Sequence, residues 1–451
     1  MTDFAAKAWN LAHPEDAIVR TLLDDDFYKF TMQQMIWTNH YNVKVEFRVK
    51  NRTKNVRLAD IIPIEALREQ LDHARTVRFT RGEILAIRGE TFYGRTDIFK
   101  PAYANMLESF RLPEYELRVE DGQYVLSTYA PWYKSSKWEV HFLTILSELY
   151  VRAQQKTMTR IELEVSYSNA RIKLHKKLMR LKEIHDLNLT CFSTRRRHTF
   201  LWQQACIEMA MEVLGDRFTG TSNVHFALKY GLEPRGTNAH ELPMVFAALA
   251  DKRSDGDPEA IRESQYAVLK EYQTFYRDNM LVFLPDTFGT TQFLKNAPDW
   301  LRYWRGPRPD SKDAYEAADE QLNWWKERGF TKEEIAKMMI LFSDGLDVNL
   351  DDGNCNGEDI RSIYNAVRPH TNPAFGWGTN FSNDFRGTVP GKPDLLAPLS
   401  IVAKAVIADG HPTVKLSDNP AKATGVDEGT IKRYKQIFGV EGIGDAVETR
   451  V

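Results

Sequence analysis

The sequence predicts an α/β fold with a largely parallel sheet, preceded by an α+β region. Three observations lead to this prediction. From about residue 156, helical segments alternate with short apolar runs that end in Gly, Thr, Ser or Asp, as βα units do. Before that point, short helical and strand-like segments are mixed. From about residue 391, the pattern is that of a helix and a hairpin that close the chain onto an earlier domain. The pattern leaves two arrangements of the parallel sheet, open or closed into a barrel.

Composition places the chain among ordinary globular proteins. Of its 451 residues, 43% are hydrophobic and 27% are charged, which excludes a disordered protein. Lys and Arg number 60 and Asp and Glu number 62, so the net charge is −2 and there is no basic surplus for bulk nucleic-acid binding. A neutral total still allows a local cluster of positive charge for a small anionic ligand.

The cysteines and the apolar segments indicate the cellular compartment in which the protein is expected. Cys191, Cys206 and Cys355 form no CxxC pair, which speaks against a disulfide scaffold or a zinc site. The first residues lack the basic and apolar regions of a signal peptide. The apolar stretch at 395–410 is interrupted by Lys404, and no run is long enough to span a membrane. We therefore expect a soluble, cytoplasmic protein.

Three elements stand out in the N-terminal region. Residues 23–37 predict a helix opened by Asp24 to Asp26, whose carboxylates suit the positive N-terminus of a helix. Residues 43–51 alternate apolar and polar side chains, as a half-buried strand does. Residues 115–130 place Asp121-Gly122 between two β-like runs, which predicts a hairpin.

Two long helices are predicted in the second region, at 166–185 and 199–215. In the first, the basic run 171–182 has Leu174, Leu178 and Leu181 at helical spacing. This spacing favours an amphipathic helix with a solvated basic face over an RNA-binding helix. In parallel α/β folds, ligands bind at the carboxyl ends of the strands, so the polar loops after the apolar runs form the candidate site.

One such loop, at 192–198, contains Arg195, Arg196 and Arg197 at the end of a predicted strand. Three consecutive arginines cannot all point the same way, but one or two can clamp a phosphate bidentately. A solvated helix start is the alternative interpretation. Positive charge beside a positive helix N-terminus is unfavourable by itself, which favours a bound anion.

Two glycine-containing loops follow. Residues 219–223 precede a helix-like segment, with Ser222 or Asn223 as N-cap, and their glycine lets backbone N–H groups approach an oxyanion. Residues 235–242 place His240 near the first turn of the next helix, where the helix dipole lowers the pKa of an imidazole and favours a phosphoryl group. A neutral His240 is a candidate nucleophile towards ATP. The alternatives are an ordinary capped turn and a hydrogen-bonded structural histidine.

Further loops carry glycines and acids. Residues 286–291 and 376–380 are compatible with phosphate binding, and residues 308–313 and 343–347 add acids suited to Mg²⁺ or a ribose hydroxyl. Such turns are common singly, but here each follows an apolar run. The chain has no P-loop, no GxGxxG after a strand, no HExxH and no GxSxG motif.

Taken in order, these segments resemble the nicotinate phosphoribosyltransferase family, from about residue 20 to 440. The matching segments are DDDFYKFTMQ (24–33), FSTRRR (192–197), TGTSNV (219–224), GTNAHE (236–241), LPDTFGTTQFL (284–294), RPDS (308–311), FSDGLDV (342–348), GWGTN (376–380) and KLSDNPAK (415–422). The resemblance implies an irregular α/β barrel of the type II phosphoribosyltransferase kind. We expect an N-terminal α+β domain at 1–155, the catalytic barrel at 156–390, and a C-terminal segment at 391–451 that returns to the N-terminal domain.

The resemblance also implies an activity in NAD salvage. The family converts nicotinate and 5-phosphoribosyl 1-diphosphate (PRPP) into nicotinate mononucleotide and diphosphate, with Mg²⁺ and with ATP as a co-substrate hydrolysed through a phosphohistidine. His240 matches the phosphorylated residue, and Tyr28 matches the aromatic residue that stacks on the pyridine ring. Arg308 matches the partner of the nicotinate carboxylate. Several relatives complete the site across a homodimer interface, which would let Tyr28 act on a neighbouring chain.

The resemblance assigns the site residues in three groups. The expected catalytic residues are His240, Arg308 and Asp310, and Asp310 is also the candidate Mg²⁺ ligand. The expected nicotinate-binding residues are Tyr28, Thr237, Arg308 and Arg196. The residues expected to bind the phosphates of PRPP are Arg195, Arg197, Thr221, Ser222, Asn223, Ser343, Asp344, Gly378 and Thr379.

One segment departs from the family pattern. Relatives usually read Asp-Ser-Gly-Asp where this chain has Asp310-Ser311-Lys312-Asp313, and lysine lacks the freedom of glycine to adopt a positive φ. The Arg-Pro-Asp-Ser run is also reminiscent of nicotinamide phosphoribosyltransferase, so nicotinamide is the alternative substrate, although GTNAHE and TGTSNV favour nicotinate. The remaining alternatives are a non-catalytic phosphate-binding regulator and an RNA-binding protein.

Overall fold

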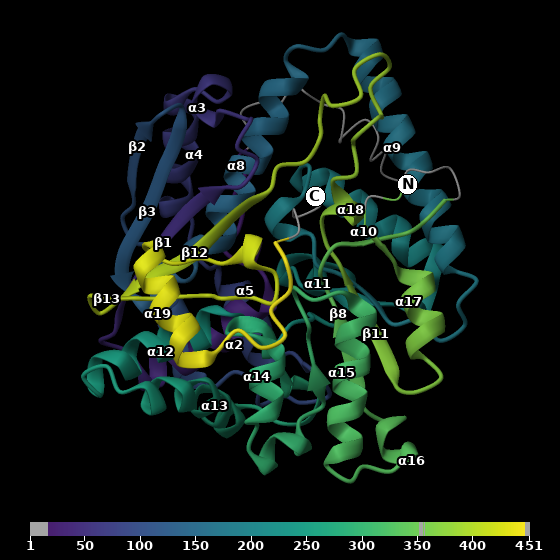
Figure 1. The fold of residues 1–451 in the computed structure, drawn as a ribbon. Helices are drawn as coiled ribbons and strands as arrows, with labels where there is room; N and C mark the ends of the chain where they lie inside the picture. The colour runs from purple at the N-terminus through teal and green to yellow at the C-terminus, as the bar shows by residue number, and fades with distance from the viewer. Residues whose placement is uncertain (1–16, 351–354, 356, 447–451) are drawn as a thin grey trace.

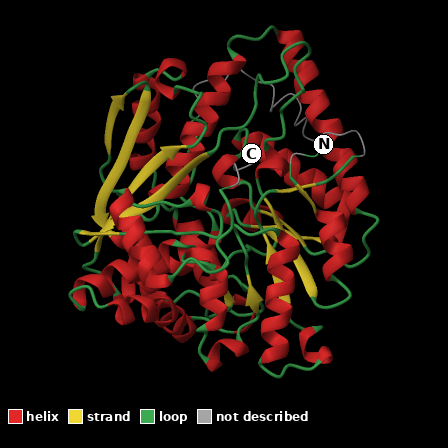
Figure 2. Ribbon diagram, in the orientation of Figure 1, coloured by secondary structure: helices red, strands yellow, loops and turns green. Residues whose placement is uncertain are grey.

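The computed structural model describes residues 17–350, 355 and 357–446. An antiparallel sheet with its helices adjoins a second body, in which helices surround short parallel strands (Figures 1 and 2). The predicted α/β class with a parallel sheet is confirmed.

The antiparallel sheet has five strands in the order β13-β12-β1-β3-β2. These strands are β1 (Lys44–Asn51), β2 (Glu116–Glu120), β3 (Gln123–Pro131), β12 (Ile401–Ala408) and β13 (His411–Pro412). Along β1, buried side chains alternate with more exposed ones, as predicted for a half-buried strand. Strand β12 pairs with β1 from Val45↔Ala408 to Asn51↔Ile401, so residues from the C-terminal part of the chain complete the sheet of the N-terminal part.

The two predicted hairpins are present. Asp121 and Gly122 lie at φ 50° and 73° between β2 and β3, as a two-residue hairpin turn requires. Strands β12 and β13 form the C-terminal hairpin. The helix expected just before it is absent, because residues 391–400 form turns followed by irregular backbone. That segment contains Pro393 and Pro398, and proline disfavours the helical conformation of the residue before it.

The helices of the N-terminal part are α2 (Phe27–Asn39), α3 (Leu58–Ile61), α4 (Ile64–Thr76), α5 (Arg81–Gly89), α6 (Pro101–Glu108), α7 (Trp132–Ser135) and α8 (Trp138–Gln155). Helix α2 follows the three aspartates, but the expectation that their carboxylates serve the helix N-terminus was wrong. Asp26 is the N-cap residue and makes no side-chain capping bond. All three carboxylates are buried, and cations of other elements pair with them.

The parallel strands are linked into an irregular barrel. They are β4 (Leu189–Cys191), β5 (Phe218–Thr221), β6 (Val282–Phe283), β7 (Gly306–Pro307), β8 (Met339–Phe342) and β11 (Asn372–Trp377), in sheets of order β5-β4-β11-β8 and β6-β7. Strands β9 (Leu346–Asp347) and β10 (Glu358–Asp359) form a separate parallel pair. Between the two sheets, the N–H of Met339 donates to the carbonyl of Arg305 at 3.2 Å. At the other edge, Thr221 bridges to Pro234, and the side-chain amide of Asn238 donates to the carbonyl of Val282 at 2.8 Å.

The helices of the second part surround these strands (Figure 1). They are α9 (Arg160–Leu181), α10 (Phe200–Leu214), α11 (Val224–Tyr230), α12 (Glu241–Arg253), α13 (Pro258–Phe275), α14 (Thr290–Lys295), α15 (Ala314–Glu327), α16 (Lys332–Ile335), α17 (Ile360–Val367) and α18 (Thr379–Ser382). The last helix, α19 (Glu428–Phe438), instead packs against α12 and α13. In α9, the three predicted leucines are buried while Lys176 and Lys182 are exposed, which agrees with an amphipathic helix. Among the described residues, no helix is both long and apolar enough to cross a membrane.

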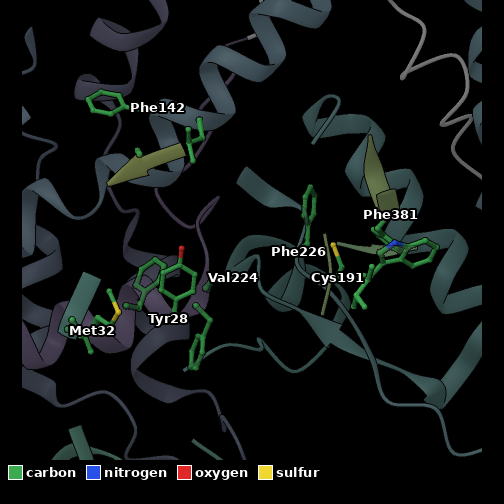
Figure 3. Packing of buried hydrophobic residues seen from close by; sticks show 14 of the residues in the cluster. Tyr28, Met32, Phe142, Cys191, Val224, Phe226 and Phe381 are labelled. Atoms are coloured by element: carbon green, nitrogen blue, oxygen red, sulfur yellow. The ribbon is translucent and has the colours of Figure 1, made fainter. Parts of the chain in front are cut away.

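One hydrophobic cluster runs through both bodies. Figure 3 shows its members Tyr28 and Met32 of α2, and Cys191, Phe226 and Phe381 of the barrel. Because a single core joins the two bodies, packing holds α2 against the barrel. The same core therefore brings Tyr28 close to the loops that follow the parallel strands.

Candidate active site

A cavity, called the main cavity below, lies at the carboxyl ends of the parallel strands. The loops after β4, β8 and β11 supply Arg195 and Arg196, residues 343–346 and residues 378–380. Strand β12 contributes residues 401, 402 and 404. The predicted convergence of strand-end loops is therefore present, and the antiparallel sheet contributes a wall that the parallel strands do not supply.

Positive charge dominates the main cavity. Among the described residues that line it, the cations are Arg52, Arg195, Arg196, Arg308, Lys404, Lys415 and Lys422, and the acids are Glu139, Asp310 and Asp344. Burial lowers the pKa of Lys404 to about 7, with Glu139 opposing the shift and Lys415 adding to it. An uncompensated set of cations in a buried site is unfavourable until an anion neutralises it, so the cavity suits a polyanionic ligand.

A second cavity, the ring cavity, adjoins the first. Both are lined by Glu139, Arg195, Arg308, Asp310 and Lys404, and the ring cavity is also lined by Tyr28, Phe47, Ala239, His240, Glu241, Ala403 and Ala405. Its aromatic and alanine walls suit a flat ring, and its cations suit a negatively charged substituent on that ring.

Tyr28 lies against the loop that carries His240. Gly236 adopts a φ of 129°, and a Cβ at this position would lie 3.5 Å from the backbone nitrogen of Tyr28. The Tyr28 hydroxyl is buried with no hydrogen-bond partner among the described residues, and burial raises its pKa. The ring and the hydroxyl of Tyr28 are therefore available to a ligand bound in the same chain.

His240 is the N-cap residue of α12, as the sequence predicts, and it is 4% exposed. Its Nδ1 lies 2.9 Å from the Thr287 hydroxyl, and its Nε2 lies 3.1 Å from both Asp310 Oδ2 and Lys415 Nζ. Burial lowers the imidazole pKa to about 4, although the nearby Asp286 acts in the opposite direction. The lowered pKa agrees with the prediction, with burial as its main cause, and the ring is neutral at pH 7.

Two carboxylates face His240. Asp286 is fully buried and accepts hydrogen bonds from the Ser311 hydroxyl at 2.7 Å and from Lys415 at 3.1 Å. Asp310 accepts a hydrogen bond from the Ser343 hydroxyl at 2.9 Å. Burial alone would raise the pKa of Asp310, but His240 and Arg308 outweigh it, so this pKa lies well below its ordinary range. One ligand atom each from His240, Asp286 and Asp310 lies within 4.8 Å of the others, so this group is the candidate cation site.

Arg308 connects the two cavities. Its guanidinium donates to the carbonyl of Asn238 at 3.0 Å and to the Ser343 hydroxyl at 3.4 Å, and it lies 3.8 Å from Asp310. These contacts hold the guanidinium at the boundary between the two cavities. Ser343, Asp344, Gly378 and Thr379, all predicted to bind phosphate, line the main cavity.

The three consecutive arginines have different surroundings. Arg195 lines both cavities, whereas Arg196, expected at the nicotinate site, lines only the main cavity. Arg197 corrects a prediction, because its side chain is fully buried and binds Asp24 bidentately at 2.6 and 2.7 Å. Its guanidinium is thus committed to the fold and does not reach either cavity.

Four further predictions are corrected by the hydrogen bonds of buried side chains. Ser222 donates to Asp26, Asn223 binds Asp24 and caps α11, and the Thr221 hydroxyl donates to the Cys191 carbonyl. The Thr237 hydroxyl faces the Val282 carbonyl at 3.5 Å. None of these four residues lines either cavity. The alternative of an ordinary capped turn therefore describes residues 219–223.

Several lining residues escaped the sequence analysis, namely Arg52, Glu139, Lys404, Lys415 and Lys422. Lys415 and Lys422 begin and end the segment KLSDNPAK, which matches the family, so the sequence did contain an indication of these two site residues. Lys404 interrupts an apolar strand, and a lone cation within such a strand is itself a signal of a site. The Lys312 that replaces the usual glycine does not adopt a positive φ, and it binds Glu320 at 2.6 Å.

The chain matches two family models. Residues 187–442 match the nicotinate phosphoribosyltransferase family, and residues 23–147 match the N-terminal domain of that family. A nicotinate phosphoribosyltransferase from Vibrio cholerae is similar, with a TM-score of 0.80, 25% identity and coverage of 94% of this chain and 95% of that chain. For the enzyme of that name from Porphyromonas gingivalis, the TM-score is 0.77 at 24% identity, with coverage of 94% and 100%. For a candidate nicotinate phosphoribosyltransferase from Saccharomyces cerevisiae, the TM-score is 0.78 at 27% identity, with coverage of 94% and 99%.

Proposed function

The chain belongs to the nicotinate phosphoribosyltransferase family and is an enzyme of that family, and we propose that it couples this activity to ATP hydrolysis through a phosphorylated His240. Nicotinate and PRPP are converted into nicotinate mononucleotide and diphosphate. The pyridine nitrogen forms a bond to C1 of the ribose as the bond from C1 to the diphosphate oxygen breaks. One observation locates this reaction in the structure: the main cavity, rich in cations, adjoins the ring cavity, and Arg195, Arg308 and Asp310 line both.

In the ring cavity, Tyr28 stacks on the pyridine ring and Arg308 pairs with the nicotinate carboxylate. A guanidinium can bind a carboxylate through two parallel hydrogen bonds, which fixes the ring in its plane. This orientation aims the ring nitrogen at the ribose and supplies part of the catalysis by positioning alone. In the main cavity, the loops at 343–346 and 378–380 receive the phosphoribosyl part, and the cations stabilise the departing diphosphate.

ATP would transfer its terminal phosphoryl group to Nε2 of His240, breaking the bond to ADP as the N–P bond forms. Three observations support this role: the imidazole is neutral, Nε2 lies 3.1 Å from the Lys415 ammonium, and His240 lines the ring cavity. The new group carries about −2 charge, which the cations near it can bind. Its arrival changes the charge of the ring cavity and links ATP hydrolysis to substrate binding.

We also propose Mg²⁺ as the metal, with Asp310 as a ligand. Mg²⁺ prefers carboxylate oxygens, which Asp310 and Asp286 both offer, and the buried Oδ1 of Asp286 has no hydrogen-bond partner in the described part of the chain. These residues therefore fit the ion, which supplies charge neutralisation to the diphosphate when bound. We further propose that the chain forms a homodimer, which sedimentation of the purified protein tests.

The same enzyme acting on nicotinamide is the alternative. The Arg308 guanidinium in the ring cavity can pair bidentately with the carboxylate of nicotinate but not with a neutral amide. Steady-state assays with PRPP and each pyridine compare the two substrates, and a higher kcat/KM for nicotinamide overturns the assignment. The non-catalytic regulator predicts no product with either pyridine, and the RNA-binding alternative predicts strongly salt-dependent RNA binding.

The decisive experiment measures mononucleotide formation from nicotinate and PRPP, with and without ATP. We expect product in both reactions and more of it with ATP, together with acid-labile ³²P on the protein from γ-labelled ATP. His240→Ala should lose the label and the ATP stimulation while retaining ATP-independent turnover. Full ATP stimulation in this variant contradicts the phosphohistidine.

A further inference from the structure

Beneath the main cavity, Lys177 of helix α9 joins two buried carboxylates. Its ammonium lies 2.5 Å from Oδ1 of Asp347 and 2.6 Å from Oδ2 of Asp384. The side chains of Lys177 and Asp347 are 1% and 0% exposed, and that of Asp384 is 9% exposed. Lys177 lies within the basic run predicted to be solvated, so its burial is an exception to the pattern of its helix. None of the three residues lines either cavity.

Asp347 and Asp384 lie just after the two segments, 343–346 and 378–380, that form one wall of the main cavity. Asp347 directly follows residues 343–346, and Asp384 follows helix α18, whose first residues are part of the lining segment 378–380. The loops are neighbours because β8 and β11 pair in parallel. Lys177 therefore connects, from behind, two loops that meet a ligand at the front.

Two further contacts tie these loops together. The side-chain amide of Asn380, in the second loop, donates to the carbonyl of Leu346, in the first, at 3.1 Å. The Lys177 ammonium also lies 6.0 Å from the ring centroid of Trp377, the last residue of β11. The ammonium is thus the centre of a small cluster that includes both loops and the end of a barrel strand.

The cluster is balanced in charge. Lys173 lies 2.6 Å from Oδ1 of Asp384, so two lysines face two aspartates. Burial lowers the pKa of Lys177, but Asp384 and Asp347 more than offset it, and the net pKa is raised. A buried carboxylate that loses its cation is strongly destabilised, so each loop is held where its carboxylate meets the ammonium.

We propose that Lys177 is a positioning residue for PRPP, which sets the spacing of the two phosphate-facing loops through Asp347 and Asp384. This inference rests on the proposed function, since it names the part of the site that receives the phosphoribosyl group. A ligand held between two loops needs the donors of both at a fixed separation, and a misplacement of about 1 Å costs on the order of 100-fold in such sites. Lys177 acts without touching the substrate.

The test is Lys177→Met, which removes the ammonium and keeps an apolar stem. We expect the Kd for PRPP by calorimetry and the KM for PRPP to rise about 10- to 100-fold. The KM for nicotinate should change by less than about threefold, since the cluster does not line the ring cavity. Lys177→Arg should recover part of the PRPP affinity. The matched control is Lys173→Met, which removes a cation that pairs with Asp384 alone and should leave the Kd for PRPP within about threefold.

An unchanged Kd for PRPP in Lys177→Met overturns the proposal, as does an equal weakening of PRPP and nicotinate. If that variant does not fold, Lys177→Met/Asp347→Asn/Asp384→Asn removes both ion pairs without leaving a buried carboxylate unpaired. A weakened Kd in the triple variant supports the proposal, and a wild-type Kd overturns it. Failure of the proposed function gives a different result: the wild-type protein forms no mononucleotide, while the comparison of PRPP affinities still reports on Lys177.

Discussion

Two sets of buried charges meet at the loop after β4, and they differ in how the charges are paired. In the first set, called the paired layer below, each cation meets its own buried carboxylate: Arg197 binds Asp24, and Lys137 pairs with Asp25. In the main cavity, cations outnumber acids. Lys415 and Lys422 pair with Asp286 and Asp344, whereas no hydrogen bond or ion pair joins Lys404 to another described residue. The paired charges hold the loops in place, whereas the unpaired cations provide the potential that a ligand neutralises.

In the run of three arginines, structural ion pairing and lining of the cavity fall to consecutive residues. Arg195 and Arg196 line the main cavity, and Arg197, the next residue, is enclosed in the paired layer. The 3-10 turn at Thr194–Arg196 directs successive side chains to different sides of the backbone. Substitutions in the paired layer should therefore act on stability, and substitutions in the cavity should act on substrate affinity.

The largest expected effect is that of Arg197→Met. Removing the cation leaves Asp24 buried and charged, which should lower the free energy of unfolding by about 3–5 kcal/mol. Urea denaturation of the two proteins measures this difference. Arg197→Met/Asp24→Asn should be more stable than the single variant, because the unpaired charge is gone.

A surface pair provides the control for that prediction. Arg160 and Glu164 form an ion pair 2.9 Å long in which Arg160 is 91% exposed. Arg160→Met should change stability by less than about 1 kcal/mol, because water and salt screen exposed pairs. Similar losses for Arg160→Met and Arg197→Met would contradict the distinction between the paired layer and the surface.

The next largest effect is the dependence of stability on pH that His240 should cause, because this histidine is buried in its neutral form. Its folded-state pKa of about 4 lies below the ordinary value of 6.5, so between these values the unfolded chain binds a proton that the folded chain does not. As the pH drops from 6.5 to 4, His240 should contribute a loss of stability of up to about 3 kcal/mol, in addition to the losses from His141 and His198, whose pKa values burial lowers to about 3. His240→Asn should lose less stability over this range in urea denaturation at several pH values. Parallel pH profiles would show that His240 is not the titrating group.

The sequence predicted the strand-end loops and a set of candidate site residues, but not which of them line the cavities. The position of His240 at a helix start follows from local spacing, and so does the convergence of the loops at 343–346 and 378–380. The burial of Arg197 depends on Asp24, which is 173 residues away in the chain. Pairing of that kind is a tertiary property that no local pattern contains. The wall from β12 was missed for the same reason, since its strand partner is β1.

Within the cavity, the largest expected effect is that of Arg308→Met. Loss of a charge-assisted pair with the nicotinate carboxylate should lower kcat/KM for nicotinate about 100-fold. The KM for PRPP should change less, and the preference for nicotinate over nicotinamide should shrink. Steady-state kinetics with both pyridines measures these changes. Arg308→Lys restores the charge without the bidentate geometry, so only partial recovery is expected. An unchanged preference between the two pyridines would remove Arg308 from the carboxylate site.

The smallest expected effect, that of Lys404→Met, tests the unpaired cations most directly. Since burial and the neighbouring cations lower the pKa of Lys404 to about 7, most of its population is neutral at pH 8. A polyanion favours the charged form, so PRPP binding at pH 8 should take up protons, and PRPP affinity should weaken as the pH rises through 7. Lys404→Met should weaken PRPP binding about tenfold at pH 6.5 and less at pH 8.5, and it should abolish part of the proton uptake. Calorimetry in buffers of different ionisation enthalpy measures both quantities. A variant that keeps the wild-type pH dependence would show that Lys404 is already neutralised within the protein, as the cations of the paired layer are.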